Sequence, residues 1–169
     1  MSRSHLIAKA RNFIRWTWLE RALLLPAWLL LGASRLVIVA LPFRYLAPRL
    51  GVQCGVSPWI PLAGARDEAR AASIGKAVRR AAALTPWESN CFPQAVTAGI
   101  LLGLCGVPYS LFFGMARGSQ ESAGIEAHAW VAAGRVPVSG GASFDRFTVV
   151  GSFVARRAIK VKKIRIRDN

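Results

Sequence analysis

The chain has 169 residues, 53% of which are hydrophobic, and it carries a formal net charge of +15 at pH 7. Its length fits one domain with a substantial core, and its charge predicts a basic surface suited to an acidic peptide, an acidic protein, anionic lipid or nucleic acid. Three cysteines without a C-x-x-C spacing argue against a disulfide framework or a zinc site and fit a reducing cytoplasm. Neither a Gly-rich phosphate loop nor an H-E-x-x-H pattern occurs, so we expect no cofactor and no metal in this chain.

Residues 1–21 are basic, with Glu20 as their one acid, and apolar side chains are interleaved with the cations. This pattern predicts a basic amphipathic helix. The helix lies either on a membrane or a partner, or on the domain itself with its basic face in water, and the sequence favours neither arrangement.

Residues 22–43 are long and apolar enough to span a membrane, but Arg35 interrupts them and prolines punctuate them. A charge near mid-span costs about 3 kcal/mol on insertion scales. We therefore predict two short apolar helices that cover the core or bind a partner, in preference to a transmembrane span or a secretory signal peptide. A connector rich in proline and glycine is predicted at residues 43–64, and a helix at residues 67–83.

Cys91 lies where an apolar helix is predicted to begin. Ser89 and Asn90 are both good N-cap residues, Pro93 is tolerated only in a first helical turn, and residues 95–104 are nearly all apolar, so Cys91 lies at or within one residue of the helix N-terminus. The helix dipole and the unpaired backbone N–H groups at such a terminus favour a thiolate, as a nucleophile requires. The alternative is a buried structural cysteine, since free cysteine is among the most buried residue types.

His128 lies in a segment that alternates like a strand, residues 125–132. Further strands are predicted at residues 109–115 and 136–138, and residues 147–154 form another strand or a short helix. The result is an α+β fold in which the cysteine helix packs on a small antiparallel sheet. A cysteine that opens a helix, followed by a histidine on a strand, is the order used by papain-like and transglutaminase-like enzymes, in which the imidazole takes the thiol proton.

Two motifs carry a resemblance to a known family. TPWESNCFPQAVTAGILLGLCGVPYSLFFGMAR, followed by EAHAWV, resembles the transglutaminase-like leader peptidases of lasso-peptide biosynthesis, often called the B or B2 protein, over roughly residues 72–153. The resemblance implies a Cys-His-Asp triad, in which Cys91 and His128 match residue for residue. The family usually places its aspartate after a short hairpin that follows the histidine. This chain has Gly140 there, and Asp145 is the next acid downstream.

The resemblance implies a cysteine peptidase that removes the leader from a ribosomally made precursor peptide. Cys91 would attack the scissile carbonyl, and His128 would act as general base and then as general acid. The oxyanion would be held by the Cys91 backbone N–H and by a second donor from Asn90 or Gln94. Trp87 either lines the thiol or simply packs.

The resemblance also implies partners. They are the lasso precursor peptide, an ATP-dependent, asparagine-synthetase-like cyclase that joins the freed N-terminus to a side-chain carboxylate, and a separate winged-helix leader-binding protein. ATP is expected only at the cyclase. We expect a cytoplasmic protein, with peripheral membrane contact as an open alternative.

Two other functions remain open. A catalytically impaired scaffold of the same fold is suggested by the missing aspartate at Gly140. A basic membrane-surface or nucleic-acid-binding protein is suggested by the charge, although the aromatic residues do not cluster with the basic tail, which disfavours nucleic acid.

By composition the chain divides into three parts. We expect a basic and hydrophobic helical region at residues 1–64, a transglutaminase-like catalytic core at residues 65–155 and a basic tail at residues 156–169. The tail is an added edge strand, a mobile arm for an acidic partner or a solvated segment.

Overall fold

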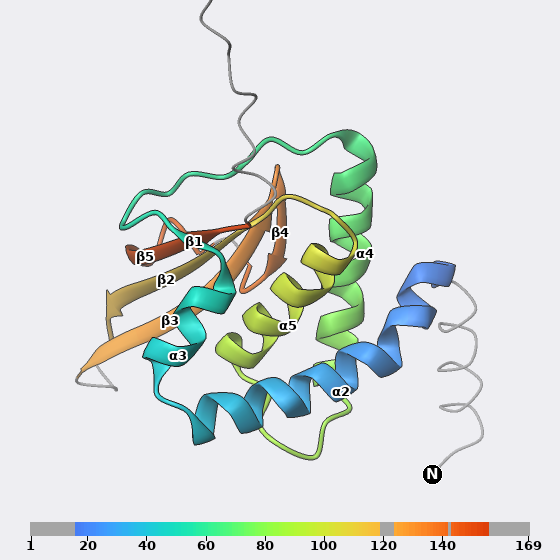
Figure 1. Ribbon diagram of the computed structural model, residues 1–169, viewed down its shortest axis with the longest axis horizontal. Coiled ribbons are helices and arrows are strands. Elements are labelled where there is room, and N and C mark those ends of the chain that lie inside the picture. The colour runs from blue at the N-terminus through green and yellow to red at the C-terminus, as the bar shows by residue number, and fades with distance from the viewer. Residues whose placement is uncertain (1–15, 119–123, 142, 156–169) are drawn as a thin grey trace, which may run out of the picture.

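The computed structural model describes residues 16–118, 124–141 and 143–155 (Figure 1). The predictions made for residues 1–15 and 156–169 lie outside the described residues. The described part confirms the α+β fold, with an antiparallel sheet and an apolar N-terminal helix. The helices are α2 (Trp18–Ala40), α3 (Phe43–Leu50), α4 (Ala65–Ala82) and α5 (Cys91–Leu104), and the strands are β1 (Val52–Gln53), β2 (Ser110–Arg117), β3 (Ile125–Ala133), β4 (Val136–Ser139) and β5 (Thr148–Val154).

The sheet has the strand order β1-β5-β2-β3-β4, and all its pairs are antiparallel. Strand β2 lies at the centre and pairs with β3 from Ser110 opposite Ala132 to Arg117 opposite Ile125. Gly134, with a φ of +55°, turns the chain from β3 into β4. The alternation at residues 125–132 thus correctly predicted β3, and residues 147–154 form a strand rather than a short helix.

The two faces of the sheet are buried in different clusters. Ala129 and Val131 of β3 belong to the main core, together with Leu101 of α5. Trp130, which points to the other face, packs with Phe112 in a second cluster. Helix α5 contacts strands of the sheet and also α2 and α4, so the cysteine helix lies between the sheet and the other long helices (Figure 1).

The expectation of two short helices at residues 22–43 was wrong, because α2 is continuous through Pro26. One face of the helix, which includes Ala27, Leu31 and Ser34, is buried, and α2 packs against α4 and α5. Burial of one unbroken face stabilises the continuous helix against the cost of an internal proline. Arg35, which argued for an interruption, is only partly exposed and forms an ion pair with a glutamate of the loop before α5.

Glu20 ties α2 to α4. Its side chain is almost fully buried and forms ion pairs with Arg80 and, at 3.6 Å, with Lys76. Burial alone would raise the pKa of the Glu20 carboxyl, but the hydrogen bonds and charges of Arg80 and Lys76 outweigh it and hold the pKa below its usual value. Glu20, the first acidic residue of the chain, therefore has a structural role, because it holds α2 against α4.

The predicted connector at residues 43–64 contains more structure than its composition suggested, since α3 and β1 lie within it. Gly51, with a φ of +145°, joins them, and a Cβ there would lie 2.4 Å from the Val154 carbonyl oxygen. Leu50 of α3 belongs to the same core cluster as α4 and α5. In the described part, residues 16–64 and 65–155 therefore share one core.

Candidate active site

Cys91 is the first residue of α5, and its side chain is half-buried. The N-cap residue is Asn90, whose backbone is extended and whose side chain makes no capping hydrogen bond. Pro93 lies in the first turn, where a missing N–H breaks no helical bond. The thiol thus lies beside backbone N–H groups that the cap side chain leaves unpaired, in the positive end of the helix dipole.

The loop before α5 is held by its own hydrogen bonds. Thr85 Oγ1 lies 2.9 Å from Ser89 Oγ and within hydrogen-bond distance of the carbonyl oxygens of Ala82, at 2.8 Å, and of Trp87, at 3.0 Å. The amide nitrogen of Gln94 donates to the Ser89 carbonyl oxygen at 2.7 Å. These contacts fix the entry of the chain into α5 and therefore the place of Cys91. They also engage the Gln94 amide nitrogen, one of the two predicted oxyanion donors, while the side chain of the other, Asn90, is exposed.

Trp87 packs away from the thiol. Its ring lies 4.8 Å from that of Trp28 in α2, and a Cβ on Gly32 would come within 2.9 Å of the indole. Of the two roles expected for Trp87, the structure shows packing. The residues that line the pocket beside Cys91 do not include Trp87, Asn90 or Gln94.

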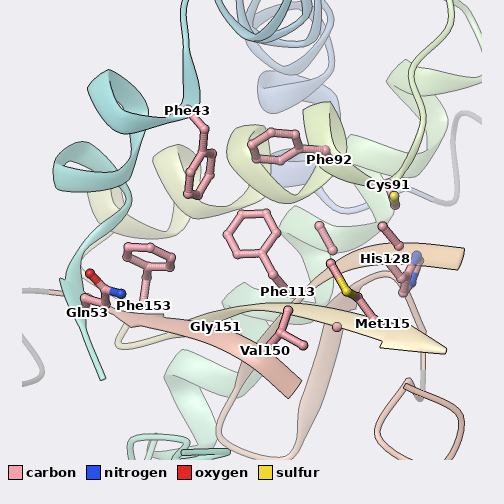
Figure 2. Close-up of a pocket in the computed structure, with 13 residues that line it drawn as sticks. Phe43, Gln53, Cys91, Phe92, Phe113, Met115, His128, Val150, Gly151 and Phe153 are labelled. Carbon is pink, nitrogen blue, oxygen red and sulfur yellow. The ribbon is translucent and has the colours of Figure 1, made fainter. Parts of the chain in front are cut away.

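A pocket of about 420 Å³ opens beside the thiol, and both Cys91 and His128 line it (Figure 2). Figure 2 shows a group of phenylalanine side chains that extends from the thiol along one side of this pocket. Their rings contact one another edge to face, for example at 5.2 Å between Phe92 and Phe113. Among the described residues of the lining, Gln53 provides the only polar side chain apart from Cys91 and His128. The apolar wall consists of Phe43, Phe92, Phe113, Met115, Val150 and Phe153.

Most residues that line this pocket could not be assigned to the site from the sequence. Phe43 and Gln53 come from the segment expected to be a connector, and Phe153 comes from the last strand. Phe113 is the exception, because the aromatic composition of its strand was a local signal for an apolar wall. The others reach the site through the pairing of β1 with β5 and of β5 with β2, which bring together segments far apart in sequence.

The imidazole of His128 is held from three sides. Its Nε2 atom lies 3.1 Å from the Gly140 carbonyl oxygen, and the ring stacks on Phe147 at 4.8 Å and on Trp130 at 5.9 Å. Because a carbonyl only accepts, Nε2 carries the proton of the neutral ring and Nδ1 is the basic nitrogen. The described contacts include no hydrogen bond between this imidazole and the Cys91 thiol.

Gly140 is the residue at which the resemblance to the leader peptidases implied an aspartate. Its φ is +78°, and a Cβ there would lie 2.5 Å from the Trp130 Cβ and 3.0 Å from His128 Nε2. The Gly140 carbonyl oxygen also accepts a hydrogen bond of 2.6 Å from the buried Ser143 hydroxyl. A backbone carbonyl, fixed by a serine, therefore contacts the histidine where a carboxylate was expected.

Asp145 is exposed and lines a different hollow, together with Val56 and Pro58. No ion pair or hydrogen bond of its carboxylate is found among the described residues. Ser139, one residue before Gly140, is buried, and its hydroxyl has no hydrogen-bond partner in the described part of the chain. The structure thus brings neither side chain into a hydrogen bond with His128.

Within the described residues, no group of three histidine, cysteine or acidic side chains is placed to hold a metal ion.

A family model described as the transglutaminase-like superfamily matches residues 37–152, more than half of the chain. Comparisons with curated proteins and with solved structures found no match. The matched range contains α5 with Cys91, β3 with His128 and the loop with Gly140. The chain belongs to the transglutaminase-like superfamily.

Proposed function

We propose that the chain is a cysteine peptidase that removes the leader from a lasso precursor peptide. Members of the superfamily are typically cysteine hydrolases or transferases. The observation that carries the proposal is that Cys91, at the N-terminus of α5, lines the same pocket as His128, whose Nε2 is held by Gly140. The choice of substrate rests on the resemblance of the motifs around these two residues.

The proposed reaction uses Cys91 as nucleophile and His128 as the proton carrier. His128 Nδ1 takes the thiol proton, and the thiolate adds to the scissile carbonyl carbon. The imidazolium then gives its proton to the leaving amine as the C–N bond breaks, and water hydrolyses the resulting thioester with His128 again as base. This sequence requires Nδ1 within hydrogen-bond reach of the thiol. Catalytic hydrogen bonds that are loose in substrate-free sites often tighten when substrate binds.

The developing oxyanion requires donors near the thiol. The Cys91 backbone N–H lies at the start of α5 and is the first candidate. The side chain of Asn90 is the better second candidate, because the amide nitrogen of Gln94 already donates to Ser89. We propose that Asn90 turns toward the oxyanion in the substrate complex.

We propose a Cys-His dyad in which the Gly140 carbonyl replaces the carboxylate of a triad. The carbonyl fixes the tautomer of His128, as an aspartate does. A neutral carbonyl stabilises imidazolium less than a carboxylate, so the dyad is expected to be slower than a full triad. A triad with Asp145 as the third catalytic residue is the competing arrangement, and the kinetics of an Asp145→Asn variant separate the two.

The pocket suggests what the substrate presents next to the scissile bond. Its described wall is aromatic and aliphatic, and Gln53 is the one neutral polar side chain that the described residues add to the dyad. Buried apolar surface favours a ligand group of the same kind. We therefore expect a large apolar side chain of the precursor, adjacent to the cleaved bond, to bind against Phe92 and Phe113.

The proposal also includes the pathway partners. A separate winged-helix protein presents the leader, and an ATP-dependent cyclase uses the amine that cleavage frees. Both act in the cytoplasm with this chain.

The deciding experiment incubates the purified chain with precursor peptide and the leader-binding protein and follows cleavage by mass spectrometry. Cys91→Ala should abolish the cleaved product. Cys105→Ala is the matched control, because Cys105 ends the same helix and is also half-buried, and it should cleave like the wild type. Cys54→Ala, in the segment after β1, should do the same.

A non-catalytic scaffold is the second candidate function, favoured by the absence of a carboxylate at Gly140. It predicts that the Cys91→Ala variant supports formation of the mature peptide as well as the wild-type chain does. That result in the complete system would disprove the peptidase and establish the scaffold.

A further inference from the structure

The outer face of α2 is apolar. Trp18, Leu25, Leu29, Leu36 and Val39 recur at helical spacing, and each side chain is between 56% and 78% exposed. We call these five residues the outer stripe. Isolated exposed leucines are ordinary, but a continuous apolar stripe along a helix of 23 residues indicates a contact surface.

The surroundings of the outer stripe are cationic. Arg21 is exposed near its first end, and Arg44 and Arg49 are exposed in α3 beyond its other end. Glu20 is the one acid in the two helices, and it is buried in its ion pairs with α4. In the described part, α2 and α3 therefore combine the apolar stripe with exposed arginines and carry no exposed acid of their own, and the exposed acid beside α2 is Glu88, which pairs with Arg35.

An aromatic side chain lies near each end of the outer stripe. Trp18 starts the stripe, and Tyr45, about half exposed, follows its end in α3. Aromatic rings and cations flanking an apolar helical face are typical of helices that lie in the interface of a lipid bilayer.

By length and composition α2 is the one described helix that could cross a membrane, but its inner face argues against crossing. Ala27 and Leu31 are fully buried against the rest of the domain, and Ser34 lies within hydrogen-bond distance of Thr97, at 3.3 Å. Glu20 holds Arg80 of α4. A crossing helix would lose these contacts and carry Glu20 and Arg35 toward hydrocarbon, so the packing of α2 on the domain argues against a spanning helix.

We propose that the outer stripe docks the protein on an anionic lipid surface, with α2 parallel to the bilayer. The stripe inserts its aliphatic side chains among the headgroups and upper acyl chains, and the arginines at the two ends contact lipid phosphates. Charge complementarity selects anionic lipid, because the whole chain carries a net charge of +15. Docking does not depend on the proposed peptidase activity.

The test is co-sedimentation of the full chain with vesicles of phosphatidylcholine containing phosphatidylglycerol, and with vesicles of phosphatidylcholine alone. We expect binding to the anionic vesicles that decreases as salt is raised, and little binding to the neutral ones. The double variant Leu29→Glu, Leu36→Glu should lower the bound fraction at least about tenfold, since it places charges in the stripe. Leu62→Glu is the control and should bind like the wild type, because Leu62 is 96% exposed and belongs to the connector before α4. That connector runs along the side of the molecule opposite α2 (Figure 1).

Three results would overturn the proposal. The first is wild-type protein that stays in the supernatant with anionic vesicles, and the second is a double variant that sediments as the wild type does. The third has three parts: the wild type is a dimer without lipid, as seen by light scattering, the double variant is a monomer, and neither protein binds vesicles. That result would assign the outer stripe to a contact between two copies. Unchanged circular dichroism and thermal unfolding of the variants establish that they fold.

Discussion

His128 Nε2 lies 3.1 Å from the carbonyl oxygen of Gly140, so a backbone group holds the imidazole where a triad would use a carboxylate. The ring is thereby fixed in the tautomer that leaves Nδ1 basic. Its stacking on Phe147 restricts it further. The orientation of the proposed base therefore depends on the loop after β4, and the roles of the loop residues can be separated by substitution.

The first prediction concerns the base itself. His128→Ala should lower the turnover of precursor cleavage by at least about a hundredfold, because no other described side chain beside the pocket is suited to take the thiol proton. Turnover is measured by mass spectrometry with saturating precursor, and circular dichroism checks that loss of the stacked ring has not unfolded the domain. His5→Ala is the control, and equal activity of the two variants would show that Cys91 is activated by another group.

The second prediction separates a dyad from a triad. Asp145→Asn should change kcat less than about threefold, because the carboxylate is exposed and makes no hydrogen bond to His128. If Asp145 completes a triad in the substrate complex, loss of its charge should instead lower kcat by orders of magnitude, up to about 10⁴-fold. Steady-state kinetics of this variant alone decide between the two arrangements.

The third prediction concerns Ser143, whose hydroxyl donates to the Gly140 carbonyl at 2.6 Å. Ser143→Ala should lower kcat several-fold by loosening the carbonyl that orients His128, and should cost about 1 kcal/mol of folding free energy for the lost hydrogen bond. Ser143→Thr keeps the hydroxyl and should restore most of the activity. A purely structural role predicts that both variants keep the wild-type pH profile of kcat/KM, whereas a positioning role predicts that only Ser143→Ala shifts the limb that reports on the base.

The same geometry determines what we expect of Gly140→Asp, the substitution that introduces the aspartate implied by the family resemblance. A simple restoration of the triad would raise the cleavage rate. The structure predicts the opposite, because a Cβ at a φ of +78° would lie 2.5 Å from the Trp130 Cβ. The variant should lose about 1–3 kcal/mol of stability from backbone strain alone. Thermal unfolding beside the cleavage assay tests this, and a stable, faster enzyme would disprove it.

Local pattern was sufficient to predict α5 with Cys91 at its start and β3 with His128. N-cap residue types, a proline confined to the first turn and an alternating start of the strand are short-range signals, and the structure has a helix and a strand there. The Asn90 side chain nevertheless makes no capping hydrogen bond, and the second half of β3 is buried on both faces. Local pattern failed where a distant contact decides the outcome. Pro26 and Arg35 suggested a broken helix, but α2 is continuous because a long buried face and a partner for Arg35 exist only in the folded molecule.

The partner of His128 could not be predicted for the same reason. A search of the sequence for an acid finds Asp145, because a sequence gives the identities of side chains but not the positions of main-chain atoms. The atom that contacts the ring is a main-chain oxygen, and its position depends on the left-handed backbone of Gly140 and on Ser143. The apolar wall of the pocket likewise depends on strand pairings between residues about a hundred positions apart, such as Gln53 with Phe153.

The last prediction concerns the ion pairs that attach α2 to α4. The pKa of Glu20 is lowered, since Arg80 and Lys76 outweigh the effect of burial. A group with a lowered pKa in the folded state contributes stability above its unfolded pKa and loses it as the pH falls through the folded value. Glu20→Gln should therefore cost about 2 kcal/mol at pH 7, the scale of a hydrogen bond to a charged group, and much less at pH 3. Urea unfolding at both pH values measures the difference.

Glu88→Gln is the control, because the Glu88 side chain is 80% exposed in its ion pair with Arg35. This substitution should cost about 0.5 kcal/mol. Equal losses in the two variants at pH 7, or a Glu20→Gln loss that does not shrink at pH 3, would show that the Glu20 pairs do not hold α2 on the domain.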